Sequence, residues 1–219
     1  MAYSADTFVA DEQPTTAKWN KLWSNDASFN DGTGIANDAI VNRHYADASI
    51  DPAHLASAAR WWEELSRVTW SSGATLATGT ITAKKYLQLI LVDTQSSANG
   101  SDMTFNGDTG ANYAHARTLE GGAFSSSVSQ NSIEMMGNYK GMQMTTAEFV
   151  NYSSLEKVGN ATWVSGPRAG TVNSAAQVPT HGEYAQKWVN TSTQITSVSV
   201  ARRSGNYAAG SELIVLGHD

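Results

Sequence analysis

The sequence predicts a mainly β protein, in which a short helical leader over residues 1–66 precedes an antiparallel, jelly-roll-like β-sandwich domain over residues 67–219. The composition is the first sign. Hydrophobic residues make up 41% of the chain and charged residues only 16%, and small polar residues, which suit short strands and many turns, fill the difference. The second sign is the periodicity, since apolar residues recur at helical spacing before Arg67 and alternate after it. The third is the succession of short β-like runs without helices between them.

The first helix is expected in the stretch QPTTAKWNKLWSNDASFNDGTGI, residues 13–35. Thr15 or Thr16 can serve as its N-cap. The glycines of NDGTG end it, because they adopt backbone angles that other residues resist. Large apolar side chains approximate one face of this helix: Trp19, Leu22, Trp23 and Phe29.

A second helix is expected to begin at Asp51, within the stretch SIDPAHLASAARWWEEL, residues 49–65. Asp51 is a suitable N-cap, and Pro52 stands at the first helical position. Its apolar stripe includes Leu55, Trp62 and Leu65. Helices of this length are marginal in water unless they pack against something. We therefore expect the leader to be an anchor or oligomerisation segment, with these contact residues: Trp19, Leu22, Trp23, Phe29, Leu55 and Trp62.

From Arg67 onward, β-type runs alternate with turn-rich stretches such as residues 120–127. The run YLQLILV, residues 86–92, should form a central strand, and it is too short to cross a membrane. Val198 and Val200 should face the core. The expected strands cover residues 67–72, 77–83, 85–93, 102–106, 112–118, 130–136, 144–152, 155–164, 183–190, 195–203 and 211–217.

Charge and cysteine content exclude several classes of protein. The formal net charge is −6, and the only basic clusters are the pairs Lys84–Lys85 and Arg202–Arg203, so a nucleic-acid groove is not expected. There is no cysteine, which excludes disulfides and thiolate chemistry. The N-terminal MAYSADTFVADEQP lacks the features of a secretory signal, and no membrane insertion is expected.

Known cofactor and metal motifs are missing from the sequence. The five histidines have no metal-ligand spacing, and neither a nucleophile elbow nor a phosphate-binding loop occurs. We expect no cofactor. The oxygen-rich loop around Asp102, Asn106 and Asp108 is a weak calcium candidate, against which turn formation is the commoner role of such residues.

Carboxylates and aromatic rings remain as candidate site residues. Glu134, Glu148 and Glu156 lie on expected strands and could form a glycosidase pair, but solvent-facing glutamates are commoner on strands, so we predict no catalytic residue. Trp163 and Trp188 are expected in the core. Tyr184 and Tyr207, which lie near loops, are the candidates for facing a ligand.

Two groups of phrases resemble the structural proteins of tailed-bacteriophage virions. FVADEQPTTAKWNKLWSNDASFNDGTGI followed by AIVNRHYADASIDPAHL is similar to N-terminal segments of such proteins. RVTWSSGATLATGTITAKKYLQLILVD, FNGDTGANYA and WVNTSTQITSVSVARRSGNYAAGSELIVLG are similar to β-sandwich domains of their fibres and appendages. The resemblance covers most of the chain and carries no catalytic signature.

The resemblance implies a head fibre, capsid decoration or short tail fibre, assembled in the cytoplasm of a bacterial host. Such a protein is a homotrimer, is anchored to capsid or tail proteins by its N-terminal segment, and displays its β domain toward a host-surface glycan. Two alternatives stay open. One is a free carbohydrate-binding module, and the other is a glycan-degrading jelly-roll enzyme.

Overall fold

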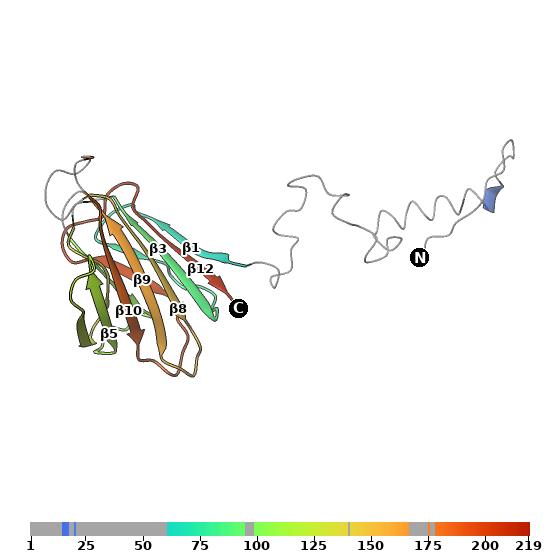
Figure 1. Cartoon of the computed structure of the whole chain (residues 1–219). Coiled ribbons are helices and arrows are strands. Elements are labelled where there is room, and N and C mark those ends of the chain that lie inside the picture. The colour runs from blue at the N-terminus through green and yellow to red at the C-terminus, as the bar shows by residue number, and fades with distance from the viewer. Residues whose placement is uncertain are drawn as a thin grey trace. The chain divides into compact units, whose positions relative to one another are not determined.

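The computed structural model describes residues 61–94, 99–139, 141–166 and 178–219, together with residues 15–17, 20 and 175. Contacts divide the chain into two units, Met1–Ala56 and Ser57–Asp219. The twelve strands found in the described residues all lie in the second unit, and Figure 1 shows how they are arranged. Among the described residues, no helix combines the length and apolar character needed to span a membrane.

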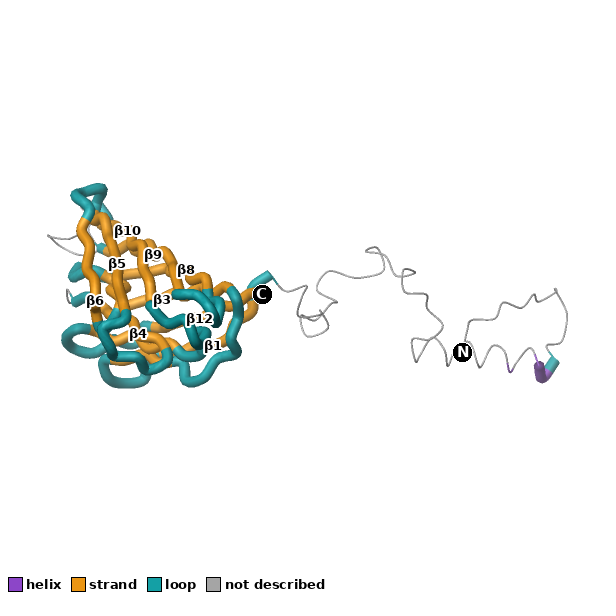
Figure 2. The backbone as a smooth tube through the Cα atoms, turned by 90° about the horizontal axis from the view of Figure 1, so that it is seen from below, coloured by secondary structure: helices purple, strands orange, loops and turns teal. Residues whose placement is uncertain are grey.

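The second unit is built from two antiparallel sheets, here called the large sheet and the small sheet (Figure 2). In spatial order, the large sheet contains β1 (Glu63–Thr69), β12 (Glu212–His218), β3 (Tyr86–Asp93), β8 (Gln143–Val150), β9 (Lys157–Ser165), β10 (Thr180–Trp188), β5 (Tyr113–Leu119) and β6 (Ser125–Gln130). The small sheet contains β2 (Thr75–Ala77), β11 (Val198–Arg202), β4 (Ser101–Phe105) and β7 (Ile133–Met136).

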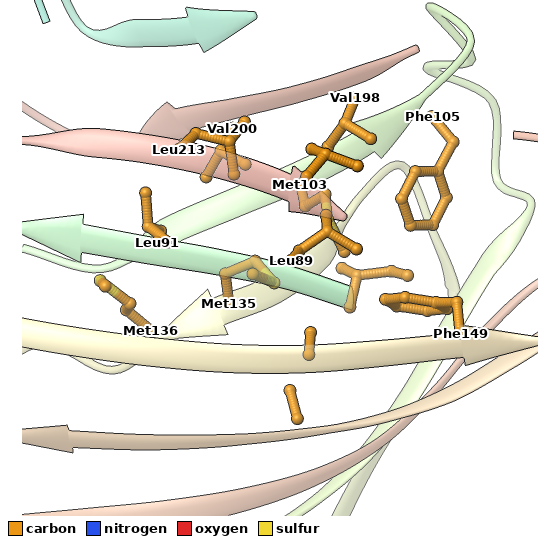
Figure 3. Close-up of a cluster of buried hydrophobic side chains, with 14 of the residues drawn as sticks. Leu89, Leu91, Met103, Phe105, Met135, Met136, Phe149, Val198, Val200 and Leu213 are labelled. Atoms are coloured by element: carbon orange, nitrogen blue, oxygen red, sulfur yellow. The ribbon is translucent and has the colours of Figure 1, made fainter. Parts of the chain in front are cut away.

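The hydrophobic core lies between the two sheets (Figure 3). Alternation along β3 buries Leu87, Leu89 and Leu91 on the inner face of the large sheet, since successive side chains of a strand point to opposite faces. Met103 and Val200 meet them from the small sheet. The expected mainly β, antiparallel β-sandwich architecture is therefore confirmed.

Several finer expectations are also confirmed. The strand β3 lies between β12 and β8 in the interior of the large sheet, as the apolar run predicts. Val198 and Val200 point into the core, and Trp163 and Trp188 are buried there. Tryptophan rings of this size contribute much of the apolar area removed from water.

The helix expected to begin at Asp51 and to reach Leu65 is wrong at its C-terminal end. Glu63–Thr69 forms the edge strand β1, in which Glu64 lies opposite Leu216 and Arg67 opposite Ile214. Leu65 thus packs against the core from a strand. Pairing with β12 outweighs the local helical pattern, because tertiary contacts routinely override intrinsic propensity.

Two further expectations on strands need correction. Residues 78–83 are not in a strand, because β2 covers only Thr75–Ala77. The serine-rich run Ser125–Gln130, whose first half falls in an expected turn, is the strand β6 and pairs with β5. Neither the hydrophobic pattern nor strand propensity marks that run, so only its partner makes it a strand.

Candidate functional site

The outer face of the large sheet carries a straight row of side chains across six neighbouring strands. Directly opposed residues in successive strand pairs make up the row: Gln88, Glu148, Asn160, Ala185, Ala116 and Ser126. Side chains opposed in this way lie about 5 Å apart. The row is polar at the β3 end and has small side chains at the β6 end.

Three adjoining hollows follow this row and together form the outer groove. The first, of about 400 Å³, extends from Trp62 and Tyr86 to Asn160. It shares Asn160 with a second hollow of about 440 Å³, and shares Val158 and Gly159 with a third of about 350 Å³. From β3 to β6 the outer groove crosses five inter-strand spacings, which is roughly 24 Å.

Aromatic rings gather at the β3 end of the outer groove. Trp61 is 76% exposed, and its ring stacks on His218 with 5.4 Å between the ring centroids. His218 in turn stacks on Tyr86 at 6.2 Å. Trp62 lies 6.0 Å from His218 and lines the outer groove together with Tyr86. Ring surface is therefore offered to solvent at this end.

The β6 end of the outer groove carries two exposed apolar side chains. Phe124 lines the second hollow and Val128 lines the third, and they are 69% and 70% exposed. Ala116 and Ala185 form the floor between the two ends. The floor is low because alanine side chains fill little of the space above the backbone.

Two carboxylates beside the outer groove have no ion pair within the described part of the chain. Gln88 donates a hydrogen bond of 3.0 Å to Glu148, which leaves most of the acceptor capacity of this carboxylate open. Glu183 lines the second hollow. Lys187, beside the third hollow, is engaged by Glu156 at 3.1 Å. The uncompensated charge at the outer groove is thus negative.

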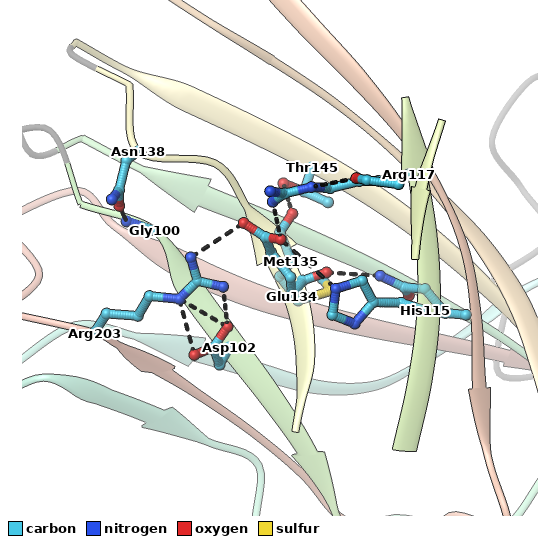
Figure 4. A network of polar contacts seen from close by, with 11 residues as sticks. Gly100, Asp102, His115, Arg117, Glu134, Met135, Asn138, Thr145 and Arg203 are labelled. Carbon is cyan, nitrogen blue, oxygen red and sulfur yellow. Dashed lines mark hydrogen bonds and ion pairs between the residues drawn. The ribbon is translucent and has the colours of Figure 1, made fainter. Parts of the chain in front are cut away.

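A second polar cluster surrounds the buried side chain of Glu134 on β7, and the partners of this glutamate are partly exposed (Figure 4). The guanidinium of Arg117 on β5 contacts one oxygen of the Glu134 carboxylate, and Arg203 contacts the other at 3.1 Å. Arg203 also binds Asp102 of β4, at 2.6 Å. The cluster connects the two sheets, because Arg117 belongs to the large sheet and Glu134 to the small sheet. Its two arginines balance its two carboxylates, so the cluster has no net charge.

His115 borders this cluster, with its Nε2 3.8 Å from a Glu134 oxygen. Desolvation lowers the pKa of His115 below 6.5. The opposing attraction of Glu134 is smaller than desolvation, and Arg117 adds to the lowering. We infer that this imidazole is neutral at pH 7.

The carboxylates considered for a glycosidase pair do not come together. Glu134 is buried in the ion cluster, with 5% of its side chain exposed. Glu148 projects from the outer face of the large sheet, and Glu156 pairs with Lys187. Because Glu134 and Glu148 lie on opposite sides of the large sheet, they cannot flank one sugar bond.

The three side chains of the weak calcium candidate, Asp102, Asn106 and Asp108, are engaged in contacts within the fold. Asp102 binds Arg203, and Asn106 accepts hydrogen bonds from the backbone N–H groups of residues 196 and 197. Asp108 accepts them from Trp188, Gly110 and Asn112. Desolvation alone would raise the pKa of Asp108, but these three bonds outweigh it and lower the pKa. In the described part of the chain, no group of three or more His, Asp or Glu side chains could hold a metal.

The two tyrosines expected to face a ligand are buried. Tyr184 is 2% exposed and Tyr207 is 1% exposed. Burial raises the pKa of both hydroxyls. The Tyr207 hydroxyl donates a hydrogen bond of 3.0 Å to Ser101 Oγ inside the sandwich. Their rings therefore cannot serve as surface platforms, and that expectation is wrong.

Of the expected anchor residues, Trp62 is described, and it lies half-buried beside the outer groove. Trp19, Leu22, Trp23, Phe29 and Leu55 lie outside the described residues. Sequence reasoning missed the outer groove. The sequence feature that could have indicated this groove is the recurrence of small or polar residues at alternate positions of a strand, as at Ala114 and Ala116. The register between strands brings these positions side by side, and the sequence does not specify that register.

Fold and site together define a class of protein, an antiparallel β-sandwich with a groove across the outer face of its larger sheet. Comparison of the chain with protein-family models, with curated proteins and with solved structures found no match.

Proposed function

We propose that this chain is a non-enzymatic structural protein of a tailed-bacteriophage virion, either a fibre-like appendage or a capsid decoration. In this proposal the part of the chain that precedes β1 anchors and trimerises the protein. The β-sandwich is displayed outward, and its outer groove is the surface that meets the host.

The outer groove is the observation that carries the proposal. It lies on a face that none of the described elements covers, and it presents aromatic and polar side chains to solvent. The resemblance of the sequence to phage appendage proteins supports the virion setting. The separation of Glu134 from Glu148 argues against the glycosidase alternative.

We also propose that the sandwich is of the jelly-roll type. Consecutive strands repeatedly change sheets, as β3 to β4 and β7 to β8 do. Crossings of this kind are typical of jelly rolls, which many viral proteins use.

Association with particles tests the proposed function. Virions of the phage that encodes the chain are purified on a density gradient and assayed for it by mass spectrometry, and we expect the chain to co-sediment with them. Light scattering of the full chain should give about three times its mass of 23.4 kDa. Trp19→Ala and Trp23→Ala should weaken particle association or trimerisation while the circular dichroism of the β domain stays unchanged.

A free carbohydrate-binding module is the second candidate, and the exposed rings of Trp61 and Tyr86 favour it. If the protein is monomeric and absent from purified particles, the carbohydrate-binding module becomes the preferred function and the virion proposal is rejected.

A further inference from the structure

We infer that the outer groove binds an extended, uncharged polysaccharide that lies across the strands of the large sheet. The inference rests on the proposed function in one respect, since it names the class of host-surface ligand. The site itself is defined by the geometry of the described residues, whatever carries the domain.

The shape of the outer groove fits a chain molecule. The three hollows adjoin through shared residues, and each falls within the range of small-ligand pockets, about 300–1,000 Å³. Together they extend across six strands, roughly 24 Å from β3 to β6. A single small molecule would leave most of this length empty, whereas an oligosaccharide of several residues would occupy it.

The chemistry of the β3 end fits a pyranose ring. A pyranose has an apolar C–H face and an edge of hydroxyls. The rings of Trp62 and Tyr86 offer apolar surface, and the polar half of the cross-strand row, Gln88, Glu148 and Asn160, offers hydrogen-bonding groups beside it. Glu148 makes one hydrogen bond in the described structure, and a carboxylate can accept several. Sugar hydroxyls supply such donors.

The middle and the β6 end fit the continuation of the same chain. Ala116 and Ala185 leave the floor low, and Phe124 and Val128 provide exposed apolar surface at the far end. A sugar chain entering over Tyr86 would thus meet apolar surface again beyond the alanine floor.

Charge excludes the commonest polymeric alternatives. Glu148 and Glu183 have no ion pair within the described residues, and Lys187 is engaged by Glu156. An anionic chain, such as a sulfated or uronic-acid polysaccharide or a nucleic acid, would meet uncompensated negative charge. The preferred occupant is therefore uncharged.

Calorimetry on the full chain tests the inference. The probes are neutral hexasaccharides of different linkage, namely cello-, laminari-, xylo-, manno- and maltohexaose, with heparin and polygalacturonate as anionic controls. We expect at least one neutral hexasaccharide to bind and neither anionic polymer to do so.

Three variants locate the site. Trp62→Ala removes a ring, and Ala185→Phe fills the floor, so each should weaken binding at least about ten-fold. Met144→Ala is the matched control, because this exposed side chain is on the outer face but does not line the outer groove. It should bind normally. Circular dichroism verifies folding, and Ala185→Phe decides the outcome if Trp62→Ala is unstable.

Several outcomes would overturn the inference. The first is that none of the neutral hexasaccharides binds the folded protein, and the second is that the protein prefers an anionic polymer. The third is that the Ala185→Phe variant binds the hexasaccharide as tightly as the parent. A change in solution mass by Ala185→Phe without glycan binding would instead assign the outer groove to contact between copies. Failure of the proposed function can be told apart from failure of this inference. If the chain binds glycan but is absent from virions, the inference holds and the virion role is refuted.

Discussion

The two faces of the large sheet come from the same strands and yet differ in almost every property. The inner face buries long apolar side chains and the ion pair of Asp93 with Arg202, and is covered by the small sheet. The outer face has half-buried aliphatic residues, a row of small and polar side chains and exposed rings. Strand alternation separates these roles, so stability is expected to depend on one face and binding on the other.

The largest effect is expected from the buried ion pair between Asp93 and Arg202, whose side chains are both fully buried. Arg202→Ala removes the positive charge that faces the buried Asp93 carboxylate and should cost about 3–5 kcal/mol of unfolding free energy. Urea denaturation measures it. The matched outer-face control is Arg67→Ala, which removes exposed pairs with Glu64 and Glu212 and should leave the midpoint nearly unchanged. Equal losses in the two variants would refute the comparison.

Adjacent residues on β3 allow the next test. Leu89 is fully buried, whereas its neighbour Ile90 points outward and is half-buried. Leu89→Ala should cost about 2–5 kcal/mol through lost burial and a cavity. Ile90→Ala should cost about 1 kcal/mol, since part of its surface is already in water. Chemical denaturation of both variants measures the two losses of unfolding free energy. A larger loss for Ile90→Ala than for Leu89→Ala would show that the outer face is covered in solution.

Gly159 tests how tightly β9 packs against β8. A Cβ built at this position would lie 2.2 Å from the carbonyl oxygen of Glu148 and 2.6 Å from the ring of Phe149. Gly159→Ala should therefore cost about 1–3 kcal/mol, seen as a lower thermal midpoint. Asn160→Ala, at the next and outward-facing position, should stay within about 0.5 kcal/mol of the parent. An unchanged midpoint for Gly159→Ala would mean that the two strands separate easily.

The smallest effect is a pH dependence from His115. Its pKa in the folded protein is lowered by desolvation, so the unfolded chain binds the proton more readily. Stability that is present above pH 6.5, the ordinary value, is lost as the pH falls below it. Thermal midpoints from pH 7.5 to 5.5 should fall less steeply for His115→Gln than for the parent. Parallel curves would contradict a neutral buried imidazole.

The sequence predicted the interior of the sandwich better than its margins. The apolar run of β3 and the valines of β11 are strong alternating patterns, and both were placed correctly. The edges failed for a common reason. The start of β1, residues 63–65, has a helix-like pattern and Ser125–Gln130 a partly turn-like composition, but each is in a strand because it completes a sheet. Edge strands bury one side only, so their sequence is weakly constrained.

The candidate site was less predictable than the fold. Tyr184 and Tyr207 were expected near loops, but both are core residues. Tyr184 lies at a buried position of β10, and Tyr207 contacts Ser101 of β4. The exposed stack of Trp61, His218 and Tyr86 joins the start of β1 to the end of β12 and the start of β3. Nothing local in the sequence pairs these positions.

The sequence by itself determined that this is a mainly β chain with an apolar central strand and no cysteine, because composition and alternation act locally. The tertiary structure alone decided which side chains share a face. Strand order and register align Gln88, Glu148, Asn160, Ala185 and Ala116 into one row, and a shift of one residue in any pairing would turn a strand over. The outer groove is therefore a property of the register, which arises from contacts between residues distant in the chain.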